Sequence, residues 1–81
     1  MHPDLSDDNL SAAELPNADL SGAFLLNVIL TASNLTGANL ANADLTNAIL
    51  FRADLSGADL TNATFLQSDL TGVVGLNLNG L

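Results

Sequence analysis

The chain has 81 residues, with nine acidic residues against a single base, Arg52, and a formal net charge of −8. Because binding to phosphate groups needs clustered Lys and Arg, this charge argues against direct nucleic-acid binding. The absence of cysteine excludes disulfides and a Cys-ligated structural zinc, while a hydrophobic content of 48% argues against intrinsic disorder.

The first residues, 1–4, contain neither the basic region nor the apolar region of a signal peptide. The longest nearly apolar stretch, residues 23–30, is eight residues long and includes Asn27, so it is too short to cross a bilayer. We therefore expect a cytoplasmic protein with no membrane segment. A thylakoid-lumen or periplasmic location is the alternative if a leader has been removed.

From residue 5 onward, a large apolar residue recurs every five residues. The residue two positions before it is usually Ala, and the residue two positions after it is Gly or Asn in nine of fourteen repeats. The large residues are Leu5, Leu10, Leu15, Leu20, Leu25, Leu30, Leu35, Leu40, Leu45, Leu50, Leu55, Leu60, Phe65 and Leu70.

A period of five fits neither regular element. On a helix such residues wind around every face, and on a strand they alternate between the two faces. The pattern becomes coherent if the chain turns a corner every five residues, and Gly and Asn tolerate the positive φ of a type II turn. Four corners close a square coil of about twenty residues, in which residue n stacks on n+20 at roughly 4.8 Å. The Leu and the small residue two before it then point inward.

The triplets Ala-(Asp/Asn)-Leu at 18–20, 38–40, 43–45, 53–55 and 58–60 resemble the motif of the pentapeptide-repeat family. This resemblance implies an all-β fold, a right-handed quadrilateral β-helix, and the period predicts about 3.5–4 coils. We expect one domain over 1–81, with regular repeats over about 3–74 and an irregular C-terminal end over 75–81. The family is abundant in cyanobacteria, which suggests such an origin.

The register breaks near the C-terminus. Gly75 stands where a Leu is due, and Leu76 and Leu81 follow one residue out of phase. This pattern predicts a one-residue bulge that ends or redirects the solenoid. Val74 and Asn79 would then take the small, inward position.

The acidic residues precede the inward Leu residues and alternate with neutral ones along the predicted stacks. The stacks are Asp4/Phe24/Asp44/Thr64, Asn9/Ile29/Ile49/Asp69, Glu14/Asn34/Asp54 and Asp19/Asn39/Asp59. Because adjacent carboxylates would repel, we interpret the alternation as an accommodation of the charge. The rival interpretation is an acidic face made by the last two stacks.

Candidate catalytic residues are lacking. His2 is the only histidine and lies at the terminus, no His–Asp pair is placed to activate a Ser or Thr, and the glycines occupy corners and not a phosphate-binding loop. We therefore expect no enzymatic activity, no catalytic residues, no cofactor, no metal site and no small-molecule substrate.

Large apolar residues in outward positions are the unusual feature of this acidic chain. Ile29 and Ile49 are neighbours in one stack, and the others lie close by on the predicted coils. The set is Phe24, Leu26, Ile29, Ile49, Phe51 and Leu66. We expect these residues to form a contact surface for a protein partner or a second copy. Exposed coil ends offer a second route to self-association.

The sequence therefore predicts a non-catalytic protein-interaction or scaffold module. The family resemblance implies an alternative, an acidic DNA mimic that acts on DNA gyrase or topoisomerase, although this chain is short and has no C-terminal dimerisation helix. A purely structural or regulatory cyanobacterial repeat protein is a further alternative.

Overall fold

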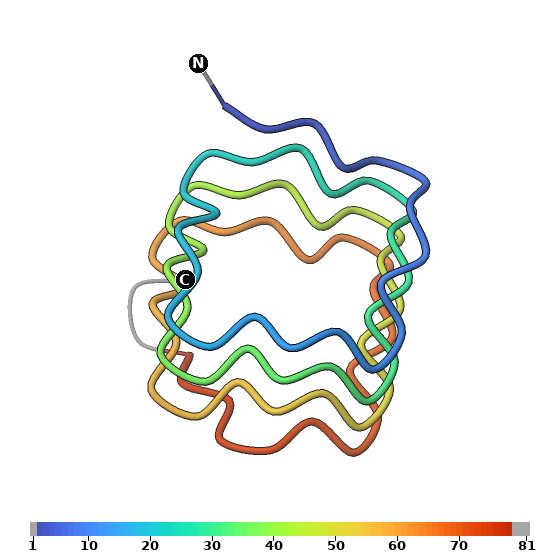
Figure 1. Ribbon diagram of the computed structural model, residues 1–81. Coiled ribbons are helices and arrows are strands. Elements are labelled where there is room, and N and C mark those ends of the chain that lie inside the picture. The colour runs from blue at the N-terminus through green and yellow to red at the C-terminus, as the bar shows by residue number, and fades with distance from the viewer. Residues whose placement is uncertain (1, 79–81) are drawn as a thin grey trace.

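The computed structural model describes residues 2–78, which contain no helix. The chain winds around a four-sided tube whose successive circuits lie beside one another (Figure 1). Eleven parallel β-bridges join each paired residue n to n+20, from Asp4–Phe24 to Asp54–Val74. Each is an isolated bridge and not part of a longer strand. This is the register that the period of five predicts.

The four sides are named here by the bridged residues at their middles. Side A contains residues 4, 24, 44 and 64, side B residues 9, 29, 49 and 69, side C residues 14, 34, 54 and 74, and side D residues 19, 39 and 59. One circuit of twenty residues is called a coil, and the first coil is 3–22. Residues 2–78 thus contain no helix that could cross a membrane.

Every corner is a type II turn. The backbone N–H three residues after each large apolar residue donates to that residue's carbonyl, from Asp8 to Leu5 through Val73 to Leu70, at N···O distances of 2.9–3.2 Å. The residue directly before each N–H donor has a φ between 57° and 72°, and ten of these fourteen residues are not Gly. Positive φ costs such residues about 1 kcal/mol each, so the corners depend on the hydrogen bonds between coils.

The inward residues form a dry core. Leu25, Leu30, Leu35, Leu40, Leu45, Leu50 and Leu55 are fully buried, with Ala, Val28 or Ser33 beside them at the small position. Each buried Leu contributes roughly 1.5–3 kcal/mol. Leu5, Leu10 and Leu15 of the first coil and Phe65 and Leu70 of the last are only partly buried, because no further coil covers them, whereas Leu20 is already buried.

The C-terminal end differs from the expectation. Val74 keeps the outward register: its N–H donates to Ala53 at 3.0 Å, its carbonyl accepts from Leu55 at 2.8 Å, and its side chain is 55% exposed. The prediction that Val74 is a small inward residue is therefore wrong. The chain leaves the register at Gly75, and Leu76 packs against the core. Asn79 and Leu81 lie outside the described residues.

Candidate functional site

Asp and Asn at the middle of a side satisfy the backbone of the corner that follows. In nine repeats the side-chain Oδ1 accepts a hydrogen bond from the N–H two residues later, at 2.9–3.2 Å. In five of these repeats the Ser or Thr hydroxyl at that position also donates to Oδ1, at 2.6–2.7 Å. We call this arrangement the Asx cap. It pairs a backbone N–H that otherwise has no protein acceptor.

The Asx caps also act on the acids. Hydrogen bonds from the hydroxyl and then the backbone N–H of Ser21 lower the pKa of Asp19, and those of Thr61 do the same to Asp59. For Asp4, the larger cause of the lowered pKa is the backbone N–H of Ser6. The ionised form is the better acceptor, so these exposed groups keep their charge at neutral pH.

Five of the fourteen corners lack the Asx cap, and at four of them the middle residue has no carboxylate or carboxamide. Those middle residues are Phe24, Ile29, Ile49 and Thr64. Within residues 2–78 no acceptor is found for the N–H groups that follow them, which belong to Leu26, Thr31, Phe51 and Leu66. All four N–H groups lie at the two corners that flank side B.

The fifth corner without an Asx cap follows side C, and it leaves no backbone N–H uncapped. Glu14 occupies a middle position without forming an Asx cap, but the residue two positions later is Pro16, which has no N–H. Uncapped N–H groups in the regular repeats therefore concentrate around side B.

The six apolar residues predicted to form a contact surface gather around the same side. Ile29 and Ile49 are bridged directly on side B. Phe24, Ile49 and Leu66 are 48%, 40% and 63% exposed. Leu26, Ile29 and Phe51 are partly buried. We call these six residues, with the four uncapped N–H groups, the apolar face.

Two further apolar side chains, Val74 and Leu78, are exposed although the five-residue pattern does not indicate it. The out-of-phase Leu76 predicts an inward Val74, and Leu78 follows the break in the register, where no period indicates the direction of a side chain. Their exposed fractions are 55% and 62%. Both belong to the C-terminal end and not to the apolar face.

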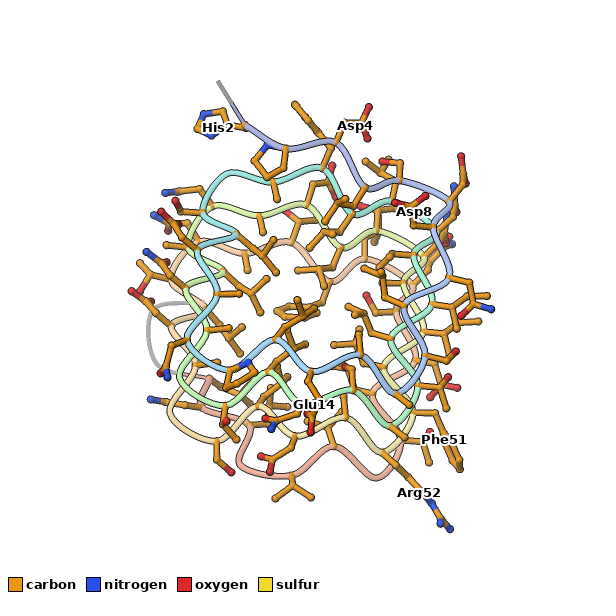
Figure 2. The ribbon with its side chains drawn as sticks, in the orientation of Figure 1. His2, Asp4, Asp8, Glu14, Phe51 and Arg52 are labelled. Atoms are coloured by element: carbon orange, nitrogen blue, oxygen red, sulfur yellow. The ribbon has the colours of Figure 1, made fainter. Side chains whose placement is uncertain are left out.

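Arg52, the single base, lies at the edge of the apolar face. Its guanidinium carbon is 5.1 Å from the centroid of the Phe51 ring, within the range of a cation–π contact. Both side chains project outward from one corner (Figure 2). The apolar face therefore ends on a positive charge in an otherwise acidic molecule.

The acids of the central coils avoid this side. Between residues 23 and 62 they are Asp44 on side A, Asp54 on side C and Asp59 on side D, and none lies on side B or at its corners. In the central coils, side B and its corners thus carry no acid, whereas Phe24 of the apolar face adjoins Asp4 and Asp44 on side A.

The described part of the chain has no pocket and no group of three or more His, Cys, Asp or Glu residues arranged to hold a metal ion. Its chemistry is that of an outer surface with apolar side chains, backbone donors and fixed charges.

Comparison with known proteins agrees with this architecture. A family model described as pentapeptide repeats matches in eight copies, over residues 9–47 and 38–74. The chain belongs to the pentapeptide repeat family, whose solved members share its β-helical fold. No curated protein matches the sequence.

Three solved structures are similar over most of this chain. A pentapeptide repeat protein from the thylakoid lumen of Arabidopsis thaliana is 26% identical, with a TM-score of 0.67, over 95% of this chain and 70% of its own. HetL, involved in heterocyst differentiation regulation in the cyanobacterium Nostoc sp. strain PCC 7120, is 32% identical, with a TM-score of 0.56, over 86% of this chain and 39% of its own. Rfr23 of the cyanobacterium Cyanothece 51142 is 36% identical, with a TM-score of 0.56, over 88% of this chain and 55% of its own. The chain thus spans less than two thirds of HetL and of Rfr23.

Proposed function

We propose that this chain is a non-catalytic interaction module that binds a protein segment on the apolar face. One observation carries the proposal: the exposed side chains of Phe24, Ile49 and Leu66 and the uncapped backbone N–H groups lie together on side B, its two corners and the adjoining side A. Either feature alone is common on protein surfaces. Together they describe a surface that offers apolar contacts and hydrogen-bond donors to the same partner.

The uncapped donors restrict the chemistry of that partner. In water, the N–H groups of Phe51 and Leu66 are hydrated at no cost, but burying them unpaired costs about 1–3 kcal/mol each. A partner that dries this surface therefore supplies acceptors, either its own backbone carbonyls or Asp and Asn side chains. An extended segment with apolar side chains meets both requirements.

We expect a right-handed quadrilateral β-helix of about 3.5–4 coils, formed by one domain. Crossovers between parallel bridged segments are almost always right-handed, which supports the handedness. The part that HetL plays in regulation supports a regulatory or structural role for this chain also, and the Arabidopsis relative supports the thylakoid lumen as an alternative to the cytoplasm.

The first test replaces Phe51 on the apolar face and uses Ala41 as its matched control. F51D and A41D each add one negative charge at a partly buried corner residue, but Ala41 lies at the corner between sides D and A. The three immobilised proteins are exposed to one extract of the producing cells. We expect A41D to retain the same protein as wild type and F51D to lose it. Equal capture by F51D would overturn the proposal.

The second test follows the uncapped donors in the complex. Amide hydrogen exchange of Leu26, Thr31, Phe51 and Leu66 is measured with and without the captured partner. We expect these amides to gain protection, while the capped N–H of Thr61 on the opposite side does not change. Protection at Thr61 with none at Phe51 would place the contact elsewhere.

The acidity supports a second candidate, a DNA mimic that acts on gyrase or topoisomerase. The lowered pKa values of Asp19 and Asp59 keep side D charged, and side C carries Glu14 and Asp54. The longest dimension of the molecule is 29 Å, which is less than one turn of B-DNA. Supercoiling by gyrase at low salt tests this role, and no inhibition at a hundredfold molar excess would remove it.

A further inference from the structure

We propose that copies of this chain stack head to tail, with the last coil of one copy against the first coil of the next. The surface is distinct from the apolar face, and the occupant is a second copy. Three observations carry the proposal: the unpaired backbone groups at the two edges, the partly buried Leu and Phe residues behind them, and the order of charges along each side.

The C-terminal edge has unpaired groups on three sides. Within residues 2–78 none of these groups has a hydrogen-bond partner. They are the N–H groups of Phe65, Gln67, Leu70 and Gly72, and the carbonyls of Ala63, Ser68 and Val73. The next position of side D, residue 79, lies outside the described residues, so this edge is described on three sides.

The N-terminal edge offers the complementary set. Its unpaired groups within residues 2–78 include the carbonyls of Asp4, Ser6, Asn9 and Ser11 and the N–H groups of Asp4, Asn9 and Glu14. Inside the molecule, each coil bonds to the next by N–H of residue n to the carbonyl of n+19, as in Leu45 to Thr64 at 2.8 Å. In a head-to-tail contact, the same pattern pairs the N–H of Phe65 with the carbonyl of Asp4 of the second copy. It likewise pairs the N–H of Leu70 with the carbonyl of Asn9 of the second copy. A second set of bonds runs from the N–H of residue n to the carbonyl of n−21, as in Thr64 to Ala43 at 2.9 Å, and would pair the N–H of Asp4 of the second copy with the carbonyl of Ala63. The two sets together give all seven groups of the C-terminal edge a counterpart.

The inner side chains at the two edges are also alike. Leu5 and Leu10 at one end and Phe65 and Leu70 at the other are partly buried, whereas the corresponding residues of the central coils are fully buried. Head-to-tail contact continues the Leu stacks and removes these apolar surfaces from water. Unpaired edges of this kind favour pairing with another chain.

The charges remain alternated across this contact. Asp4 of the second copy would lie over Thr64, Asn9 over Asp69, and Glu14 over Val74, so no two acids become stack neighbours. The opposite arrangement, first coil against first coil, is repulsive, because that coil carries five of the nine acids: Asp4, Asp7, Asp8, Glu14 and Asp19. Asp4, Asp8 and Glu14 lie along this open end (Figure 2).

Gln67 provides a selective test. It lies at the corner between sides A and B, where head-to-tail stacking places Asp7 of the second copy over it. Inside the molecule the same corner already has a carboxamide–carboxylate pair, Asn27 Nδ2 to Asp7 Oδ1 at 3.1 Å. The neighbour of Gln67 in its own chain is Asn47, which is neutral. A charge introduced at 67 therefore meets a like or opposite charge only in a head-to-tail contact.

The experiment measures the molar mass of the 81-residue chain by sedimentation at concentrations up to 1 mM and at low salt. For wild type we expect the mass to rise with concentration without a plateau at the dimer, because a head-to-tail contact does not close. Q67E should weaken and Q67K should strengthen association about three- to fivefold, with both shifts reduced at 0.5 M salt. The control N47E adds the same charge away from the edge and should leave association unchanged.

Several results would overturn the proposal. They are a wild-type chain that is monomeric at 1 mM, a plateau at the dimer, Q67E and Q67K changing association in the same direction, or N47E acting as Q67E does. Opposite effects of Q67E and Q67K on association distinguish the head-to-tail contact from a contact between two C-terminal ends. In the latter, residue 67 of one chain would face residue 67 of the other, so either charge would be repulsive. If F51D abolishes association while Q67E and Q67K leave it unchanged, self-association occurs through the apolar face instead.

Discussion

The Oδ1 atom of Asp59 accepts hydrogen bonds from both the backbone N–H of Thr61, at 3.0 Å, and its hydroxyl, at 2.6 Å. Equivalent caps recur wherever Asp or Asn occupies the middle of a side. Six of the nine acidic residues therefore do more than carry charge, because each of the six pairs a backbone donor at the next corner. Where the cap is lost, around side B, the outward side chains are apolar except for Thr31 and Thr64.

The Asx caps predict how stability depends on pH. The pKa of Asp59 is lowered in the folded state, so its contribution is present above its unfolded pKa and is lost as pH falls through the lower, folded value. D59N keeps a cap oxygen that does not titrate. We therefore expect the melting temperature of wild type, measured by circular dichroism, to fall relative to that of D59N between pH 5 and pH 2. A difference that is constant with pH would contradict this role of the cap.

The alternation of acids along side D predicts a cost for breaking it. N39D inserts a third carboxylate between Asp19 and Asp59, which are the bridged neighbours of Asn39. We expect N39D to lower the free energy of unfolding at low salt, with the loss recovered at 0.5 M salt. N42D adds the same charge at a corner whose stack neighbours are Gly22 and Asn62, and should be nearly neutral. Equal effects of the two variants would contradict the stacking argument.

The core contains a hydroxyl without a partner. Ser33 is 1% exposed, and no hydrogen bond to its Oγ is found within residues 2–78. S33A supplies the small apolar residue that most repeats have, and we expect a gain of about 1 kcal/mol in urea denaturation. Ser68 is the matched comparison, because its Oγ donates to the Leu45 carbonyl at 2.8 Å. S68A should lose about 0.5–1.5 kcal/mol, and changes of the same sign in both variants would refute this distinction.

The departure from the register at Gly75 predicts an effect specific to that glycine. A Cβ there would lie 2.6 Å from Cα of Ser56, and φ is 72°. Gly57 has the same φ, but its nearest neighbour, the Gly37 backbone, is 3.7 Å away. We expect G57A to cost about 1 kcal/mol and G75A at least about 2 kcal/mol, measured by urea denaturation. Equal costs would mean that the C-terminal segment adapts freely.

Much of the fold was predictable because the signals are local and repeated. The outward and inward positions, the corners and the stacking of n on n+20 all follow from a pattern that recurs every five residues. The clustering of Ile29, Ile49 and Phe51 followed from the same arithmetic. The prediction failed at Val74, because the missing Leu at 75 indicates that the register breaks but not on which side of the gap it does so.

The sequence by itself determined the period, and with it the direction of each regular side chain, because five-residue spacing leaves one consistent way to bury the Leu residues. Only the tertiary structure decided where the register ends and how far each apolar side chain is exposed. It also decided that, within residues 2–78, the Ser33 hydroxyl lacks a partner and the N–H groups of Leu26, Thr31, Phe51 and Leu66 lack acceptors. These properties depend on distances between atoms about twenty residues apart in the chain. A pattern in the sequence orders such neighbours but does not measure the space between them.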